Sequence, residues 1–167
     1  KVCKPRLHCV AWLPCLNFKN NDKSTIKLSL KAEIEVYIMK IGTYFDDYEF
    51  SCNCERHEVD ENGHNVLDHI IDKRLVELLD AIRERLGVPL YINSGYRCPE
   101  HNEEVGGVPN SQHVEGTAAD ITYDGIDVDY LAQIAEECGA DGIGKYYNQG
   151  FVHVDVRGYA ARWNDLD

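Results

Sequence analysis

Between residues 68 and 86 the apolar side chains recur with the period of an α-helix. The apolar stripe consists of Leu75, Leu78, Leu79, Ile82 and Leu86. Charged residues such as Asp72 and Arg83 fall on the opposite side, so the predicted helix is amphipathic. Gly87 follows directly and is the expected stop signal.

A second amphipathic helix is predicted from Asp127, a suitable N-cap, to Cys138. Its inward-facing residues are Leu131, Ile134, Ala135 and Cys138. Gly139 ends it. The chain therefore carries two helices that each have one apolar face.

Four segments are predicted to be β-strands. They are residues 88–92, 118–122, 142–147 and 151–156. The last two flank Asn148-Gln149-Gly150, a short glycine-containing hairpin turn, so they are expected to pair antiparallel. Helices and strands are mixed along the chain, and this mixture predicts an α+β domain.

A domain boundary is predicted near Met39, the only methionine of the chain. The segment before it has three cysteines, mixed charge and little periodicity, apart from an alternating stretch at 26–30 that predicts a strand. We therefore interpret residues 1–38 as an N-terminal extension of unknown role and residues 39–167 as the functional domain.

The composition narrows the classes of partner. The chain has 167 residues, 44% of them hydrophobic and 28% charged, which is typical of one globular domain. A net charge of −12 argues against nucleic acid as a partner, because phosphates would be repelled. No apolar run approaches the roughly 20 residues of a membrane span. We expect no signal peptide, since the apolar stretch at 9–16 is short and broken by Pro14. We also expect the protein to be a monomer.

The seven cysteines are expected to be mostly reduced thiols, because their number is odd and no secretion signal is seen. Cys52 and Cys54, with His57 nearby, have two interpretations. They are part of a second metal site, or they are two small buried side chains in a turn. We favour the second interpretation from the sequence alone.

The predicted strand at 151–156 alternates strictly. Val152, Val154 and Val156 share one face and are expected to pack into the core. Phe151, His153, Asp155 and Arg157 share the other face, which is expected to border a cleft. Such clean alternation makes His153 a poor candidate for a core histidine.

His113 and Asp120 are separated by seven positions. On one helix this separation is about 10 Å of rise, and on one strand the two side chains would point to opposite faces. The chain therefore has to turn between them, and Gly116 with Thr117 is the natural place. A carboxylate inside the apolar run at 118–122 needs a partner, and a cation provides one.

His113, Asp120 and His153 together form a two-histidine, one-carboxylate set. Zinc held by three protein ligands keeps a fourth position open for water, as in hydrolases. The sequence thus predicts one catalytic Zn²⁺ on these three residues.

Two stretches, SGYRCPEHNEEVGGVPNSQHVEGTAADI at 94–121 and GIGKYYNQGFVHVDVRGYAARW at 142–163, resemble the zinc D-alanyl-D-alanine carboxypeptidases and related murein peptidases. The resemblance covers residues 39–163, and YFDDYEFSCNC at 44–54 is similar to the opening segment of the family. These proteins share a fold with the Hedgehog signalling domain. The resemblance implies a single α+β domain with a small antiparallel sheet flanked by helices.

The resemblance also implies roles for individual residues. His113, Asp120 and His153 match the zinc ligands of the family, and Arg97 matches its contact to the substrate carboxylate or oxyanion. Ser111 and Asn102 fall where the family keeps polar loop residues, and for both a role in the turn and a contact to substrate are open.

The general base is the point of departure from the family pattern. Many relatives carry an acidic residue three before the strand histidine or another histidine two before it. Here those positions are Gly150 and Phe151, which cannot transfer a proton. Asp155 is the available candidate, and its alternative role is to orient a zinc-bound histidine.

The predicted function is that of a zinc-dependent peptidase, a carboxypeptidase or an endopeptidase, that hydrolyses stem or cross-link peptides of peptidoglycan. The alternative is a catalytically inactive, zinc-containing module that binds peptidoglycan or peptides. With no export signal, we expect a protein made in the cytoplasm that reaches the cell wall by lysis, a phage-type holin route or a larger particle.

Overall fold

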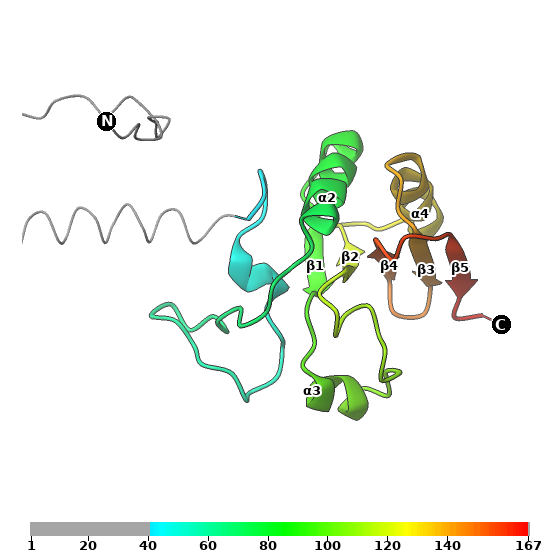
Figure 1. Cartoon of the computed structure of the whole chain (residues 1–167). Coiled ribbons are helices and arrows are strands. Elements are labelled where there is room, and N and C mark those ends of the chain that lie inside the picture. Colours follow the sequence, from blue (N-terminus) through cyan, green and yellow to red (C-terminus); the bar gives the residue numbers. More distant parts are fainter. Residues whose placement is uncertain (1–40, 167) are drawn as a thin grey trace, which may run out of the picture. The chain divides into compact units, whose positions relative to one another are not determined.

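The computed structural model describes residues 41–166 (Figure 1). The predicted extension at 1–38, its strand at 26–30 and the boundary near residue 39 lie outside these residues and stay predictions. The elements in chain order are η1 (Asp47–Phe50), α2 (Lys73–Leu86), β1 (Tyr91–Ser94), α3 (Pro99–Glu104), β2 (Ala118–Thr122), α4 (Val128–Glu137), β3 (Gly142–Tyr146), β4 (Phe151–Asp155) and β5 (Ala161–Asn164).

The strands form one sheet in the order β1-β2-β4-β3-β5. The first four strands in this order pair antiparallel with one another. The predicted hairpin of β3 and β4 closes with Tyr146 opposite Phe151. β5 was not predicted, and it joins the edge of the sheet parallel to β3. The α+β class is therefore confirmed, with a mixed sheet in place of a purely antiparallel one.

The two predicted amphipathic helices are confirmed. α2 begins later than the periodicity suggested, because the Asp72 side chain accepts the Arg74 N–H and caps the helix there. Gly87 ends α2 in the left-handed conformation (φ 74°), which a residue without Cβ adopts readily. The Asp127 carboxylate caps α4 through the Tyr130 N–H, as predicted.

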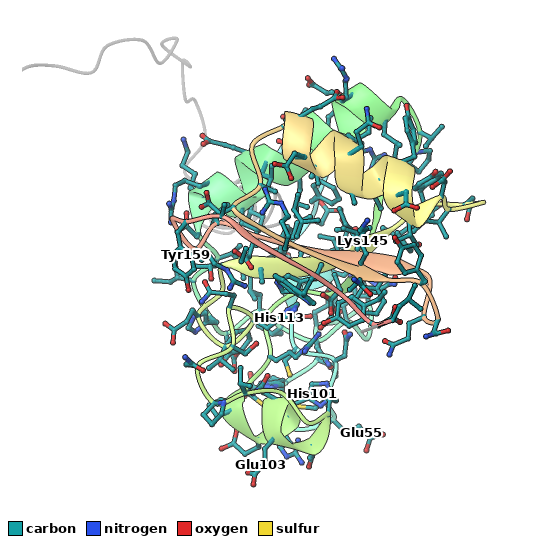
Figure 2. The ribbon with its side chains drawn as sticks, turned by 90° about the vertical axis from the view of Figure 1, so that its right-hand side faces the viewer. Glu55, His101, Glu103, His113, Lys145 and Tyr159 are labelled. Atoms are coloured by element: carbon teal, nitrogen blue, oxygen red, sulfur yellow. The ribbon has the colours of Figure 1, made fainter. Side chains whose placement is uncertain are left out.

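The apolar faces of α2 and α4 pack on one face of the sheet and form the main core (Figure 2). Fully buried members of this core are Leu75, Leu79, Ile82, Ile121, Leu131, Val152 and Val154. The valines of β4 therefore lie where the alternation placed them. Within the described part of the chain, no helix is both long and apolar enough to cross a membrane.

β1 begins three residues after the predicted start at 88. Val88 is exposed, whereas Leu90 is buried in the core, and pairing starts only with Tyr91 opposite Thr122. The apolar residues before Tyr91 thus belong to the connection that leads from α2 into the sheet.

The opposite face of the sheet is covered by two long segments, residues 51–72 and residues 95–117 with α3 inside them, here together called the loop layer (Figure 2). A backbone hydrogen bond from Asp72 N–H to Gly116 O (2.9 Å) ties the two segments to each other, and one from Arg97 N–H to His113 O (3.2 Å) closes the second segment on itself. Gly95 passes so close to Phe50 that a Cβ would lie 2.6 Å from the Phe50 Cα. The loop layer is therefore held mainly by polar contacts, whereas the helical side has the large apolar core.

Truncating Leu79 to alanine should lower the free energy of unfolding by about 2–5 kcal/mol, because Leu79 is fully buried between α2 and the sheet. Ile70→Ala is the matched control, since the Ile70 side chain is 87% exposed and its loss should change stability by no more than about 0.5 kcal/mol. Urea denaturation of both variants measures the difference. Equal effects would contradict the assigned core.

Candidate metal centre

Asp120 and His153 face each other across neighbouring strands. They are direct partners in the antiparallel register of β2 and β4, so the sheet itself places the carboxylate against one imidazole. His113 reaches the same point from the loop layer, because the chain reverses at Gly116, which has φ 69°. The predicted turn between His113 and Asp120 is thus present, and all three side chains are buried.

The three candidate ligand atoms form a nearly equilateral triangle. His113 Nε2 lies 3.2 Å from Asp120 Oδ1 and 3.1 Å from His153 Nδ1, and the third edge, His153 Nδ1 to Asp120 Oδ1, is 2.9 Å. For bonds of about 2.05 Å, two ligands of a tetrahedral metal are about 3.3 Å apart. The triangle therefore matches one face of a tetrahedron to within a few tenths of an ångström.

Each ligand also has a partner on its far side. His113 Nδ1 donates to Gly95 O at 2.7 Å, which leaves Nε2 with a lone pair for a metal. His153 Nε2 lies 3.1 Å from Asp155 Oδ2, which in the same way leaves Nδ1 for the metal. Asp120 Oδ2 accepts a hydrogen bond from Arg97, so Oδ1 is the oxygen turned toward the histidines. The donor set thus fits one divalent cation.

The electrostatics agree with a cation site. Burial alone raises the pKa of Asp120, but in the metal-free site its contacts with the imidazoles of His113 and His153 outweigh burial and hold that pKa well below its usual range. Burial lowers the pKa of His113, which favours the neutral imidazole that binds metals. Burial also opposes a charge on His153, but hydrogen bonds to Asp120 and Asp155 raise its pKa. Two carboxylates around His153 thus attract positive charge to this point.

The centre lies at the floor of a cleft of about 830 Å³. Arg97, predicted to contact substrate, and Ser111, for which a role in the turn and a contact to substrate were both open, line this cleft. Ser111 also accepts the His113 N–H at 3.3 Å, so it supports the turn that carries the ligand. Asn102 is buried away from the cleft, and its side-chain amide donates to Val108 O at 2.8 Å, which is a role in the turn.

Asp155 shares the strand face of His153, as predicted, but it does not line the cleft. It is fully buried beneath β3, where a Cβ on Gly142 would overlap its carboxylate. Arg157 Nε donates to Asp155 Oδ1 at 2.8 Å, so the carboxylate is paired with a guanidinium as well as with His153. Asp155 therefore shares a strand face with His153 without being exposed to the cleft.

Two neighbours of the centre were missed by the sequence analysis. Trp163, from the unpredicted strand β5, lies with its ring centroid 5.1 Å from that of His153. It fits against β3 because Gly144 has no side chain there. Its indole Nε1 donates to the hydroxyl of Tyr146 at 3.1 Å, and both rings line the cleft. The residues of β5 have no apolar alternation that would have revealed this wall.

An α+β domain that presents two histidines and a carboxylate at the floor of a cleft has the organisation of a metallopeptidase domain. The comparison with known families agrees. The model of the family Peptidase M15 matches residues 43–155, and the chain belongs to this family.

Curated relatives are similar over part of the chain. The sequence is 33% identical over 100 residues to "Peptidoglycan L,D-endopeptidase MepK" of Escherichia coli (strain K12). The aligned region covers 56% of this chain and 54% of that protein. The MepK proteins of Escherichia coli O157:H7 and Shigella flexneri match with the same identity and coverage. The chain thus spans about half the length of these relatives.

Replacing Asp155 by alanine should lower the affinity of the centre for Zn²⁺ about 10- to 100-fold, because His153 loses the group that orients its ring. Competition with a chromophoric chelator measures the affinity, and far-UV circular dichroism confirms folding. Asp129→Ala is the control, since this exposed carboxylate pairs with Lys145 instead. A folded Asp155→Ala variant with unchanged affinity would refute the orienting contact.

Proposed function

We propose that this protein is a zinc-dependent peptidase that cuts peptides of peptidoglycan. The observation that carries the proposal is the triangle of His113 Nε2, Asp120 Oδ1 and His153 Nδ1 at the lining of the cleft, which leaves a fourth coordination position of a metal for water or substrate. The membership in Peptidase M15 and the names of the MepK relatives support the same activity and substrate class.

Zinc is the metal that suits this donor set best. Two imidazoles and one carboxylate oxygen are frequent ligands of catalytic zinc, and the short edges of the triangle suit its bond lengths. When bound, zinc supplies a Lewis acid and a water nucleophile that is available near neutral pH.

Arg97 is assigned two tasks. Its guanidinium bonds to Asp120 and so fixes the oxygen offered to the metal, while its Nε donates to Ser94 Oγ at 2.8 Å. Because Arg97 also lines the cleft, its charge is placed to stabilise a substrate carboxylate or the oxyanion that develops during hydrolysis.

Asp155 is assigned the role of a positioning residue, the second of the two roles that the sequence left open. A general base has to reach the reacting water directly or through one further water. Asp155 is fully buried, lies outside the lining of the cleft, and is engaged by His153 and Arg157. Its negative charge nevertheless strengthens His153 as a ligand.

We assign the protein to endopeptidases rather than carboxypeptidases. The MepK relatives are named as L,D-endopeptidases. The cleft is walled both by the loop layer, through Arg97 and Ser111, and by the sheet, through Tyr146 and Trp163. Walls on both sides of the centre suit a peptide that continues on both sides of the scissile bond.

Incubation of the zinc-loaded protein with purified, cross-linked muropeptides should produce fragments cut inside the cross-link, identified by mass spectrometry. His113→Ala should reduce cleavage to the level of the metal-free protein, because one of three ligands is lost. Asp129→Asn should retain full activity, because Asp129 pairs with Lys145 and does not line the cleft. Release of only a terminal D-alanine would show a carboxypeptidase, and binding of muropeptides without any cleavage would favour the inactive binding module.

The role of Asp155 is tested by comparing turnover with metal content. Asp155→Asn should have a kcat within about tenfold of the wild type once the zinc concentration is high enough to fill the centre. A general base would instead cost about 10²- to 10⁴-fold at full occupancy. Zinc content measured on the same samples by mass spectrometry separates the two roles.

A further inference from the structure

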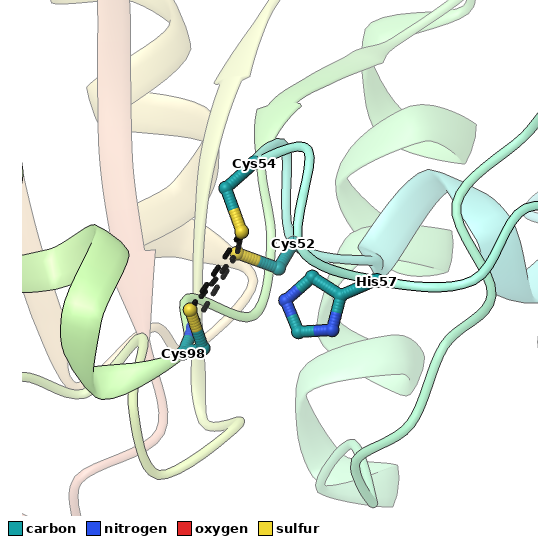
Figure 3. Close-up of side chains that lie close together, drawn as sticks. All are labelled: Cys52, Cys54, His57 and Cys98. Atoms are coloured by element: carbon teal, nitrogen blue, oxygen red, sulfur yellow. Dashed lines mark hydrogen bonds between the residues drawn. The ribbon is translucent and has the colours of Figure 1, made fainter.

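A second cluster of metal-ligand side chains lies in the loop layer, apart from the centre described above. Its members are Cys52, Cys54, His57 and Cys98 (Figure 3). The three thiols are buried, and they form a small cluster of their own that is separate from the main core. Tyr96 is the partly buried apolar side chain packed against them.

The sulfur atoms form a triangle of tetrahedral size. Cys52 Sγ lies 3.6 Å from Cys54 Sγ and 3.8 Å from Cys98 Sγ, and the third edge, Cys54 Sγ to Cys98 Sγ, is 3.8 Å. With zinc–sulfur bonds of about 2.3 Å, two thiolates of a tetrahedral site are about 3.8 Å apart. A disulfide needs sulfurs at about 2.05 Å and would leave one of the three thiols unpaired.

His57 completes the set. Its Nδ1 lies 2.8 Å from Asp68 Oδ2, while its Nε2 is buried and has no hydrogen-bond partner. Figure 3 shows the imidazole beside the three sulfurs, with one ring nitrogen turned toward them. A carboxylate on one nitrogen and a metal on the other is the usual environment of a zinc-bound histidine. A bound metal would also satisfy the orphaned Nε2.

The backbone around the cluster is arranged for thiolates. The Cys98 N–H donates to Cys52 Sγ and the His101 N–H donates to Cys98 Sγ, both at 3.4 Å. The Asn65 amide holds the chain between the first two thiols by donating to Cys52 O (2.7 Å) and Cys54 O (3.0 Å). Asn53 is exposed between two buried neighbours, so the thiols of Cys52 and Cys54 both turn inward.

We propose that Cys52, Cys54, Cys98 and His57 bind one structural zinc ion. Four protein ligands close this site, whereas three leave the centre at His113 open, so the two sites have different roles. Binding displaces the thiol protons to solvent and joins the segment after η1 to the start of α3. The ion takes the place of an apolar core in a layer that has few large buried side chains.

The position of this site matters for the cleft. Cys98 directly follows Arg97, which bonds to Asp120, and Asn53 lies between two of the thiols and lines the cleft. The structural zinc would therefore hold one wall of the cleft in place. This inference does not depend on the proposed function, because the metal site can be tested without measuring activity.

The first test is substitution of Co²⁺ for zinc in the full chain. Thiolate ligands should give sulfur-to-cobalt charge-transfer absorption in the near ultraviolet and the strong visible bands of tetrahedral Co²⁺. Cys52→Ser and Cys98→Ser should lose the charge-transfer band and one equivalent of metal. Cys138→Ser, a thiol outside the cluster, should keep both.

Two further controls separate other sources of the signal. His113→Ala should keep the charge-transfer band, since the centre at the cleft has no sulfur ligand. The triple variant Cys3→Ser, Cys9→Ser, Cys15→Ser should also keep it. Loss of the band in the triple variant, with retention in Cys52→Ser, would place the metal elsewhere and overturn the proposal.

A variant that gains signal covers the case in which serine variants fail to fold. His57→Cys should still bind metal and raise the charge-transfer absorption by about one third, because four thiolates replace three. In the wild type, a thiol reagent should reach Cys52, Cys54 and Cys98 only after a chelator removes the metal. Unchanged absorption in His57→Cys, or equal thiol reactivity with and without chelator, would refute the site.

Discussion

The structure depends on one buried carboxylate. Asp120 is buried in β2 between the apolar residues Ala119 and Ile121. A buried charge is tolerated there only when other groups pair with it. His153 comes from the adjacent strand, Arg97 from the beginning of the loop-layer segment 95–117 and His113 from near its end. Three parts of the chain therefore converge on one side chain, and the cleft lies where they meet.

The two faces of the sheet are stabilised by different kinds of interaction. On one face, α2 and α4 bury a continuous apolar core, which provides stabilisation without directional contacts. On the other face, the loop layer is joined by hydrogen bonds and by small clusters of polar or thiol side chains. The polar face is the one that carries chemistry, because ligands and substrate contacts need fixed directions.

The sequence was most informative where local periodicity and geometry agree. The alternation of β4 placed His153 correctly, and the seven-residue separation of His113 and Asp120 required the turn found at Gly116. The sequence could not show that Asp155 is covered by β3, because this depends on which strand lies alongside. β5 was missed for want of alternation. Cys98 joins Cys52 and Cys54 only through folding, since α2 and β1 lie between them in the chain.

The glycines of β3 have a consequence for how this site can change. Gly142 leaves room for the Asp155 carboxylate and Gly144 for the Trp163 indole, so at these two positions the strand offers only bare backbone. Neither glycine has a side chain that could contact the candidate metal ligands. Both nevertheless determine which side chains, Asp155 and Trp163, can pack against His153. Substitutions that alter specificity should therefore not be tolerated at these two positions. They would have to come from the loop layer on the other side of the cleft.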